Sequence, residues 1–278
     1  MEPTRILVTG STDGIGLETA CELAELGHRV IVHGRSNEKA ASARKRVASR
    51  ASANVSGGEA GGAETVIGDL SSLKEVDAMA REINERFPDL RVVVANAGVT
   101  TKTRRESVDG HELTFAVNHL AHFLLINRLV NTLKANVPSR IVVVSSMVHR
   151  SGQIHFDDLQ LTRGFSGSDA YSQSKLANLL FAFELARRLE GTGVTVNGLH
   201  PGVISTKLLH VNFSGGAPVS AGAKTPVYLA TADDLKNVTG KYFENRRETS
   251  PAKAGLDVEA ARRLWDLSEE LIESAVNT

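Results

Sequence analysis

Two side chains in the second half of the sequence have the types and spacing that proton transfer requires. Tyr171 and Lys175 are four residues apart in the run AYSQSK. Residues four apart share one face of a helix, so the phenol and the ammonium should lie one turn apart. A neighbouring ammonium favours the phenolate and lowers the pKa of the phenol. We therefore predict a proton donor and a residue that tunes it. The alternative is a chance pair on a helix face, because YxxxK alone is a short motif.

A glycine-rich segment near the amino terminus predicts a dinucleotide site. Residues 5–9 are rich in branched apolar side chains and should form a strand, and a helix should follow over about 15–26. Glycine permits a tight turn and close approach to a ligand, while free N–H groups at the helix start can face a pyrophosphate. The alternative is an ordinary glycine-rich turn. The predicted contacts are Gly10, Ser11, Thr12, Asp13, Gly14, Ile15 and Gly16.

The end of the second predicted strand, residues 28–33, indicates which dinucleotide binds. A protein that selects NAD usually places a carboxylate here for the ribose 2′-hydroxyl. No carboxylate occurs before Glu38, whereas Arg35 offers a fork of donors that suits a 2′-phosphate. NADP(H) is therefore predicted over NAD(H). The alternative for Arg35 is a solvated side chain at a strand end.

Other candidate residues follow the carboxyl ends of further strands, where open α/β sheets bind ligands. Asp69 could accept from an adenine amino group, or could cap the following helix, although Ser71 or Ser72 could equally fill that role. A hydroxyl of the pair Ser145-Ser146 could orient a substrate carbonyl. The remaining predicted cofactor contacts at strand ends are Leu70, Asn96, Ala97, Gly98, Pro201, Gly202, Val203 and Thr206.

Asn118 lies inside a long helix, which we expect Asp109 to cap and which should run to Leu133. Asparagine is unfavourable within a helix, and an inward-facing amide must find partners. Asn118 is thus a candidate for holding a water molecule or bending the helix. The alternative is a polar residue on the surface.

The elements that position these residues alternate along the chain. Strands are expected at 5–9, 28–33, 65–67, 91–95, 140–144, 194–199 and 240–243, with helices at 15–26, 37–50, 73–87, 109–133, 170–189, 219–231 and 257–275. This order predicts an α/β fold: a single-domain, Rossmann-type, doubly wound parallel sheet of about seven strands with helices on both faces. Residues 51–63 should form a flexible loop.

We expect one domain over 1–278. Residues 1–140 would form mainly the cofactor-binding half, and residues 141–278 the catalytic and substrate-binding half. A lid is predicted around 203–218, with Gly215-Gly216 as its hinge.

Composition restricts the partners. Of 278 residues, 41% are hydrophobic, and 32 Lys+Arg balance 32 Asp+Glu, so neither a nucleic-acid nor a membrane surface is indicated. Cys21 is the only cysteine, which excludes an intrachain disulfide, and we expect it to be buried. No targeting segment, no apolar run of spanning length and no metal-ligand spacing is recognised. The expected location is cytoplasmic.

Several spaced motifs, taken in order, resemble the signature set of the short-chain dehydrogenase/reductase family. They are TGSTDGIG at 9–16, NAG at 96–98, Asn118, Ser146, YSQSK at 171–175 and PG at 201–202. The resemblance spans almost the whole chain. It implies an NAD(P)-dependent oxidoreductase that interconverts a carbonyl and an alcohol of a small molecule.

The resemblance also implies roles for individual residues. Tyr171 would donate the proton to the carbonyl oxygen, and Lys175 would lower its pKa and hold the nicotinamide ribose. Ser146, the second of its pair, would bond the substrate oxygen. Asn118 would hold a water in a proton relay through Lys175. Thr206 would contact the nicotinamide carboxamide or the phosphates.

The spacing of 25 positions between Ser146 and Tyr171 is longer than in the simplest members of this family. The segment GQIHFDDL at 152–159, with SP at 250–251 and RLW at 263–265, looks like the retinol dehydrogenase and WW-domain oxidoreductase-like subgroup. That resemblance implies NADP and a hydrophobic or polycyclic substrate.

Two other functions are weighed against this one. A non-catalytic NADP(H)-binding regulatory protein would have no need of Tyr171, Lys175 and Ser146 together. An enzyme acting on nucleotide sugars is disfavoured by the glycine pattern and the short carboxyl-terminal part. A homodimer or homotetramer is left open.

Overall fold

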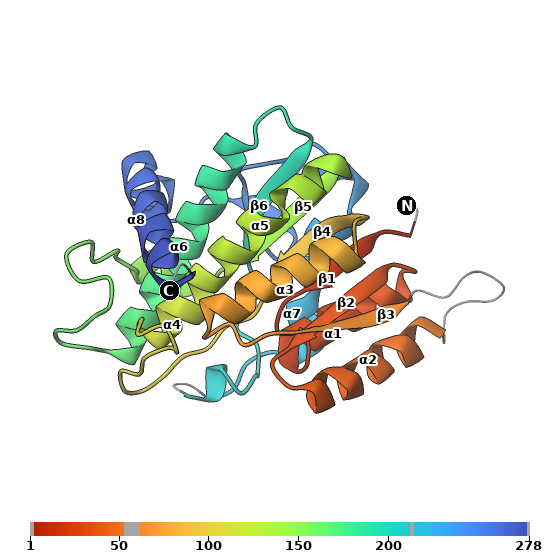
Figure 1. The fold of residues 1–278 in the computed structure, drawn as a ribbon, viewed down its shortest axis with the longest axis horizontal. Coiled ribbons are helices and arrows are strands. Elements are labelled where there is room, and N and C mark those ends of the chain that lie inside the picture. Colours follow the sequence, from red (N-terminus) through yellow and green to blue (C-terminus); the bar gives the residue numbers. More distant parts are fainter. Residues whose placement is uncertain (1–2, 53–61, 212–213, 277–278) are drawn as a thin grey trace.

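The computed structural model describes residues 3–52, 62–211 and 214–276. Within them, one eight-stranded sheet has the order β3-β2-β1-β4-β5-β6-β7-β8, and every neighbouring pair is parallel except β7 and β8 (Figure 1). The strands are β1 (Arg5–Val8), β2 (Arg29–Gly34), β3 (Ala63–Ile67), β4 (Leu90–Ala95), β5 (Ser139–Val144), β6 (Val194–His200), β7 (Tyr242–Glu244) and β8 (Arg247–Thr249).

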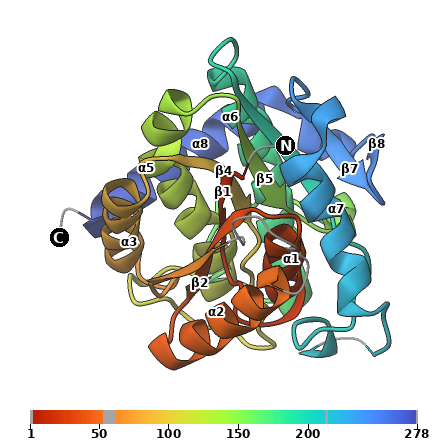
Figure 2. The same cartoon turned by 90° about the vertical axis from the view of Figure 1, so that its right-hand side faces the viewer.

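Helices cover both faces of this sheet. They are α1 (Gly14–Glu25), α2 (Asn37–Ser52), α3 (Leu73–Arg86), α4 (Leu113–Phe115), α5 (Ala121–Ala135), α6 (Gly167–Arg188), α7 (Val219–Thr231) and α8 (Val258–Val276). One apolar cluster joins α1, α2 and α7 to the sheet, and a second joins α3, α5, α6 and α8 to its other face (Figure 2). Strands buried on both faces explain the nearly continuous apolar runs of the sequence. The predicted doubly wound parallel sheet is confirmed.

The order of the strands creates the crevice that a ligand would enter. From β1 the chain moves outward to β2 and β3, and then crosses back to β4 on the other side of β1. The carboxyl ends of β1 and β4 therefore diverge, and in open α/β sheets ligands bind at such a switch point. The glycine-rich turn follows β1, and the NAG motif at 96–98 follows β4.

The prediction that Asp109 caps the long helix is wrong. Its carboxylate accepts from the N–H of Leu73, at the start of α3, with an N–O distance of 2.8 Å. Glu112 is the cap instead: it is completely buried, and its two carboxylate oxygens accept from the N–H groups of Thr114 and Phe115 at 2.8 and 2.7 Å. A turn with Gly110 at φ +80° separates the two acids and directs them to different helices.

An eighth strand was not predicted. β8 forms a hairpin with β7 through Asn245 and Arg246, whose φ angles are +48° and +61°. Two consecutive residues with positive φ are typical of the two-residue turns that join antiparallel strands, and glycine is the usual sequence signal for them. Arginine at the second position gave no such signal.

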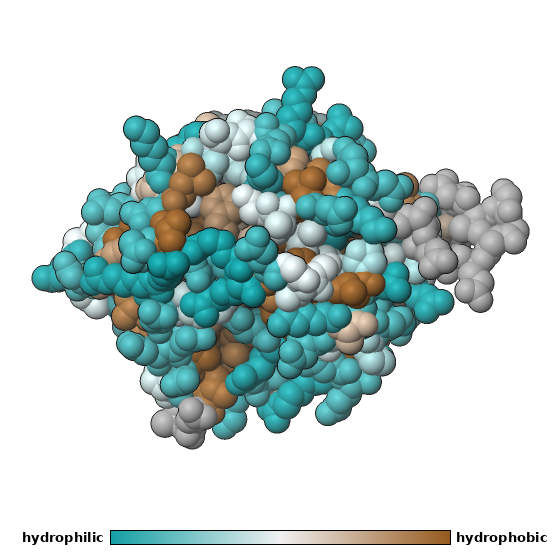
Figure 3. All heavy atoms as spheres, turned by 90° about the horizontal axis from the view of Figure 1, so that it is seen from above, coloured by the Kyte–Doolittle hydropathy of each residue, from teal (hydrophilic) through white to brown (hydrophobic). Residues whose placement is uncertain are grey.

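One stretch, Leu113–Ala135, is long and apolar enough to cross a membrane, contrary to the sequence expectation. Within the protein, 78% of its apolar 18-residue window is buried, as expected of a core helix. The ring of Trp265 on α8 lies 4.7 Å from that of Phe123 and 5.8 Å from that of Phe181, so α8 covers this helix. On the face shown in Figure 3, hydrophobic residues form small separate patches among hydrophilic ones.

The remaining boundaries differ from the predicted ones by a few residues. Cys21 is buried, as expected. The predicted flexible loop lies mainly at 53–61, outside the described residues, while Ala51 belongs to α2 and Ala63 to β3.

Candidate active site

Four polar residues predicted to act together lie at one place beside the ends of β4 and β5. Tyr171 and Lys175 occupy successive turns of α6, and the Ser146 side chain lies near enough to the phenol to act on its pKa. The Lys175 ammonium nitrogen lies 5.6 Å from the centre of the Tyr171 ring. A Cβ built on Gly98 would be 3.5 Å from Lys175 Nζ and 3.4 Å from Asn118 Oδ1. Gly98 therefore lies against Lys175 and Asn118, two of the four predicted catalytic residues.

The two consecutive serines after β5 do different things. Ser145 is buried, and its hydroxyl donates to the carbonyl of Lys175 at 2.7 Å, which ties β5 to α6. Ser146 is partly exposed, and its hydroxyl accepts from the N–H of Val148 and lies near the Tyr171 phenol. Only the second hydroxyl is therefore placed to meet a substrate.

Asn118 is completely buried, so the surface alternative is wrong. Its Oδ1 accepts from the N–H of Val99 at 2.7 Å, and its Nδ2 donates to the carbonyl of Val99 at 3.0 Å and to the Ser174 hydroxyl at 2.9 Å. The helix is wound as a π-helix over Ala116–Leu120, between α4 and α5. A departure from regular α-helix at this asparagine was one of the two roles expected, and such bulges are frequent at functional sites.

Burial dominates the electrostatics of the pair on α6. It raises the pKa of Tyr171 to about 12, although the nearby Ser146 hydroxyl acts in the opposite direction. Burial also lowers the pKa of Lys175 to about 8, because the charged form is poorly solvated there. Lys175 donates to the carbonyl of Val144 at 3.1 Å rather than to the phenol. The expectation that the lysine lowers the pKa of the tyrosine is thus reversed in the protein alone.

The glycine-rich turn leaves room where side chains would close it. Gly10 and Gly14 have φ angles of +63° and +55°, in the left-handed region that favours glycine. A Cβ on Gly10 would lie 2.9 Å from Ala97 Cα, and one on Gly16 would lie 2.4 Å from the carbonyl oxygen of Gly10. The turn therefore packs backbone against backbone, as a cradle for a pyrophosphate requires.

The other residues predicted for this turn divide into two groups. The Ser11 hydroxyl is buried, donates to the carbonyl of Val8 and accepts from the N–H of His33, so it serves the fold rather than the crevice. Ile15 lies beside Gly222 of α7. Asp13 and Thr12 are more accessible.

Asp13 accepts from the N–H of Gly14, which caps α1, and its carboxylate pairs with Lys207 at 2.5 Å. The hydrogen bond from Lys207 lowers the pKa of Asp13. This ion pair joins the turn to the segment after β6.

The predicted adenine end of the site contains an exposed arginine. Arg35 is exposed and has no ion-pair or hydrogen-bond partner within residues 3–52, 62–211 and 214–276. Asp69 accepts from the N–H of Ser71 at 2.9 Å, while Ser72 caps α3 by accepting from Glu75 N–H. Asp69 is therefore not needed as the helix cap, and the buried Leu70 follows it.

The end of β4 is fixed to the end of β1. The Asn96 side chain donates to the carbonyl of Thr9 at 2.9 Å, and the backbone N–H groups of Asn96 and Ala97 donate to the Thr9 hydroxyl at 2.9 and 3.0 Å. Asn96 thus links the two neighbouring strands.

The segment after β6 reaches the glycine-rich turn. Its Gly202 has φ +101°, and a Cβ on Gly14 would lie 3.6 Å from the methyl group of Thr206. Pro201 is partly exposed and Val203 is half-exposed. The predicted lid begins here; residues 212–213 lie outside the described part of the chain.

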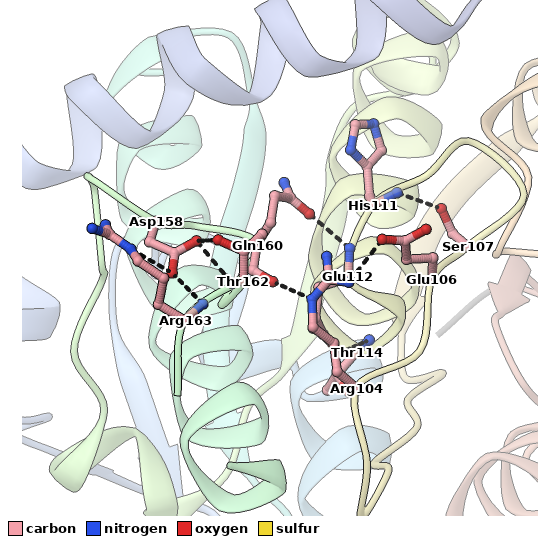
Figure 4. Close-up of polar contacts among 10 residues, drawn as sticks. All are labelled: Arg104, Glu106, Ser107, His111, Glu112, Thr114, Asp158, Gln160, Thr162 and Arg163. Atoms are coloured by element: carbon pink, nitrogen blue, oxygen red, sulfur yellow. Dashed lines mark hydrogen bonds and ion pairs between the residues drawn. The ribbon is translucent and has the colours of Figure 1, made fainter. Parts of the chain in front are cut away.

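Two loops beside α6 form a polar network that sequence reasoning missed (Figure 4). Arg104 Nε donates to the carbonyl of Gln160 at 3.0 Å, and the side-chain oxygen of Gln160 accepts from the N–H of Glu112 at 2.7 Å. These bonds join the loop before α4 to the long connection after β5. Their partners are about fifty residues apart, so no local pattern could reveal them. Among the described residues, no cluster suits a metal ion.

Sequence reasoning also missed three buried histidines. His33 accepts at Nδ1 from the N–H of Gly10 at 2.9 Å and bonds the carbonyl of Gly68 through Nε2 at 3.1 Å. His122 and His149 contact the backbone of Asn118 and Ser146. A single histidine in an apolar run is the only signal that the sequence carries.

A doubly wound sheet with a glycine-lined turn at its switch point, adjoined by Tyr171, Lys175, Ser146 and Asn118, defines the class of dinucleotide-binding oxidoreductases. The turn and the space around Gly98 fit such a cofactor, since side chains there would fill it. The family model for short chain dehydrogenase matches residues 4–215. The chain belongs to this family and is an NAD(P)-dependent oxidoreductase.

Individual relatives agree with this assignment. Human retinol dehydrogenase 14 is 41% identical over 98% of this chain and 87% of its own length. A crystal structure of an uncharacterised protein from Mycobacterium paratuberculosis has a TM-score of 0.79 and 32% identity, covering 98% of this chain and 95% of that one. A gluconate 5-dehydrogenase from Burkholderia cenocepacia, solved with NADP and tartrate, shares the fold at a TM-score of 0.69 and 22% identity, covering 87% and 93% of the two chains.

Proposed function

We propose that the protein is an NADP(H)-dependent enzyme that interconverts a carbonyl and an alcohol on a hydrophobic small molecule, with Tyr171 as proton donor and acceptor. The observation that carries this proposal is the Tyr171 phenol, which lies near enough to the Ser146 hydroxyl for that group to act on its pKa and is flanked by the buried ammonium of Lys175. These groups suit proton transfer to an oxygen atom.

Each residue has a defined task in this proposal. The Tyr171 hydroxyl gives its proton to the carbonyl oxygen during reduction, and the Ser146 hydroxyl holds the same oxygen. Lys175 holds the nicotinamide ribose, and Asn118 holds the water that passes a proton toward Lys175. The bound nicotinamide supplies or takes up the hydride. A phenol with a pKa of about 12 releases a proton with difficulty at neutral pH, so a positive charge on the oxidised nicotinamide ring would favour the phenolate.

The choice of NADP(H) rests on Arg35. It is exposed directly after β2 and is not paired with any described acidic residue. A guanidinium with free donors suits the 2′-phosphate of NADP(H), whereas the ribose hydroxyl of NAD(H) would need an acceptor.

The proposed substrate class rests on side chains at two strand ends. Met147 follows Ser146 directly and is 47% exposed, and Val203 follows Gly202 and is 50% exposed. Large apolar groups exposed beside polar reacting groups are typical of pockets for apolar ligands. The similarity to retinol dehydrogenase 14 supports a lipid-like carbonyl or alcohol. We place this activity in the cytoplasm, in line with the balanced charge.

The first experiment measures NADPH and NADH consumption with aldehydes, ketones, quinones, steroids and retinaldehyde, using Tyr171→Phe as the control. We expect turnover that falls by about a thousandfold or more in the variant, while the Kd for NADPH changes less than about threefold. A variant with most of the activity would contradict the role of Tyr171. NADPH binding without any turnover would support the regulatory alternative.

A second experiment tests the choice of cofactor. Arg35→Asp should raise the Kd for NADPH about ten- to a hundredfold and leave or improve the Kd for NADH, because it replaces a donor with a repelling carboxylate. Lys39→Asp, an exposed substitution in the first turn of α2, is the matched charge control. Equal loss in both variants would contradict a specific role of Arg35.

A further inference from the structure

Two buried histidines bond the main chain of catalytic candidates in the same way. His122 Nδ1 lies 3.0 Å from the carbonyl oxygen of Asn118, and His149 Nδ1 lies 2.6 Å from that of Ser146. A carbonyl oxygen can only accept, so each Nδ1 must carry the ring hydrogen. The histidines follow their partners by four and three residues, within the same local turn.

The second nitrogen of each ring reaches a distant segment. His149 Nε2 accepts from the N–H of Ala252 at 3.1 Å. His122 Nε2 lies 2.9 Å from the Thr9 hydroxyl. That oxygen accepts from two backbone N–H groups, so it approaches His122 with its own hydrogen, for which the Val94 carbonyl at 3.4 Å is the more distant acceptor. The bonds therefore fix the same tautomer in both rings, with hydrogen on Nδ1 and a lone pair on Nε2.

Both rings are enclosed by the protein. His149 is completely buried and His122 is 1% exposed. Burial lowers the pKa of both, that of His122 to about 4, so both are neutral near pH 7. A neutral imidazole is the only form of the side chain that donates at one nitrogen and accepts at the other. The neutral state that burial favours in both rings is thus the state that their hydrogen bonds require.

We propose that His122 and His149 are positioning residues that hold the backbone of Asn118 and Ser146 against segments far away in the sequence. His122 joins Asn118 to Thr9, at the end of β1 beside the glycine-rich turn. His149 joins Ser146 to Ala252, just before α8. Through these links the position of each catalytic group depends on a second part of the fold. The proposal rests on the proposed function for its kinetic consequences, but not for its structural ones.

The energetic reason is the precision that proton transfer needs. A displacement of about 1 Å can cost about a hundredfold in rate. The hydroxyl of Ser146 and the amide of Asn118 move with their own backbone, and both lie where regular structure changes: Ser146 begins a 3₁₀ turn, and Asn118 lies in the π-helical segment. A side chain that bonds the carbonyl at such a place adds a restraint; at Ser146 it acts beside the backbone bond that the same carbonyl accepts from the N–H of His149 at 3.2 Å.

Two conservative substitutions distinguish the hydrogen bond made by Nδ1 of each histidine from the one made by Nε2. Asparagine places an amide near the Nδ1 position and preserves the donor to the carbonyl, whereas glutamine reaches the Nε2 position and loses that donor. We expect His122→Gln and His149→Gln to lower kcat about ten- to a hundredfold with KM within about threefold, because the restraint on the catalytic residue is lost. His122→Asn and His149→Asn should keep kcat within about threefold of the wild type.

His119 provides a matched control in the same helix. It is 1% exposed, and its Nε2 bonds the Ser268 hydroxyl on α8 at 2.9 Å rather than the backbone of a catalytic candidate. His119→Gln and His119→Asn should therefore change stability but not kcat. Equal loss of kcat in the asparagine and glutamine variants at 122 and 149, or the same loss at 119, would overturn the proposal.

A spectroscopic measurement tests the proposal without any substrate. In the wild-type protein labelled with ¹⁵N-histidine, ring-nitrogen chemical shifts should show the Nδ1–H tautomer for His122 and His149 and the Nε2–H tautomer for His33, between pH 6 and 8. Protonated rings or the opposite tautomer at 122 or 149 would overturn the proposal. If no substrate is turned over, the proposed function fails. The chemical shifts still test the positioning proposal, because they report which ring nitrogen carries the hydrogen.

Discussion

The cofactor turn and the catalytic group are held in opposite ways. At the turn after β1, positions are fixed by what is missing: Gly10 and Gly16 approach other backbone so closely that a Cβ would collide. At the catalytic group, positions are fixed by what is present: Asn118 is bonded by the side chains of Ser174 and His122, and Ser146 by that of His149. One site depends on empty space and the other on added bonds.

This difference predicts different responses to mutation. A turn made of close backbone contacts should be intolerant of any added atom, whatever its chemistry. A group held by several hydrogen bonds should lose activity to a degree that depends on which hydrogen bonds the substituted side chain can still make. The following substitutions test that contrast, from the largest expected effect to the smallest.

Lys175→Met keeps the volume of the side chain and removes its chemistry. We expect kcat/KM to fall by about 10² to 10⁴, since the group that holds the ribose and relays the proton is lost. Single-turnover and steady-state rates with NADPH measure this. An active variant would show that the ammonium is not part of the machinery.

The same variant has a pH signature in stability. The pKa of Lys175 in the folded protein, about 8, is below its ordinary value of 10.5. Between these values the unfolded chain binds more protons, so the free energy of unfolding of the wild type should rise with pH, relative to the variant. We expect about 2 kcal/mol between pH 7.5 and 9.5 from urea unfolding of both proteins. A constant difference would mean that the pKa of Lys175 is not lowered.

Gly16→Ala adds one methyl group at a place with no room. The new Cβ would lie 2.4 Å from both the carbonyl oxygen of Gly10 and the Asn96 side-chain nitrogen. The turn must shift, at a cost of about 1–3 kcal/mol, so the Kd for NADPH should rise about ten- to a hundredfold. Gly62→Ala is the control, since no atom of the described residues lies within 4 Å of its Cβ. A Gly16 variant that binds like the control would contradict the steric account.

Lys207→Gln should have the smallest effect. The pair with Asp13 is exposed on both sides, with side-chain exposures of 91% and 63%, and such pairs are weak and screened by salt. Titrating NADPH at low and high salt, we expect a change in Kd below about threefold, and smaller at high salt. A larger change that persists in high salt would mean that Lys207 contacts the ligand directly.

The sequence predicted the parts of the site that depend on local spacing. The YxxxK pair on α6, the glycine pattern and the alternation of strands and helices follow from helix and sheet periodicity, which a single segment displays. The alternative uses of Ser145 and Ser146 could be decided only by the contact of Ser145 with Lys175, thirty residues away.

The errors have the same physical origin. Asp109 looked like a helix cap because acids favour that position, but Glu112 stands nearer the helix start and Asp109 turns to α3. The reversed pKa of Tyr171 arose because spacing shows which charges are neighbours and does not show how deeply they are buried. Long-range contacts and solvation are properties of the folded chain, and local patterns do not contain them.

The short strand β8 has a consequence for how molecules of this protein can meet. An unpaired sheet edge offers N–H and C=O groups to another chain and can seed aggregation. Here the outer edge beyond β7 is covered by only three residues, Arg247–Thr249, of which Arg247 and Glu248 are exposed and charged. Such a strand is a poor template for sheet extension between molecules. Subunits that associate on this side would therefore have to meet through side chains, and not by continuing one sheet into the next.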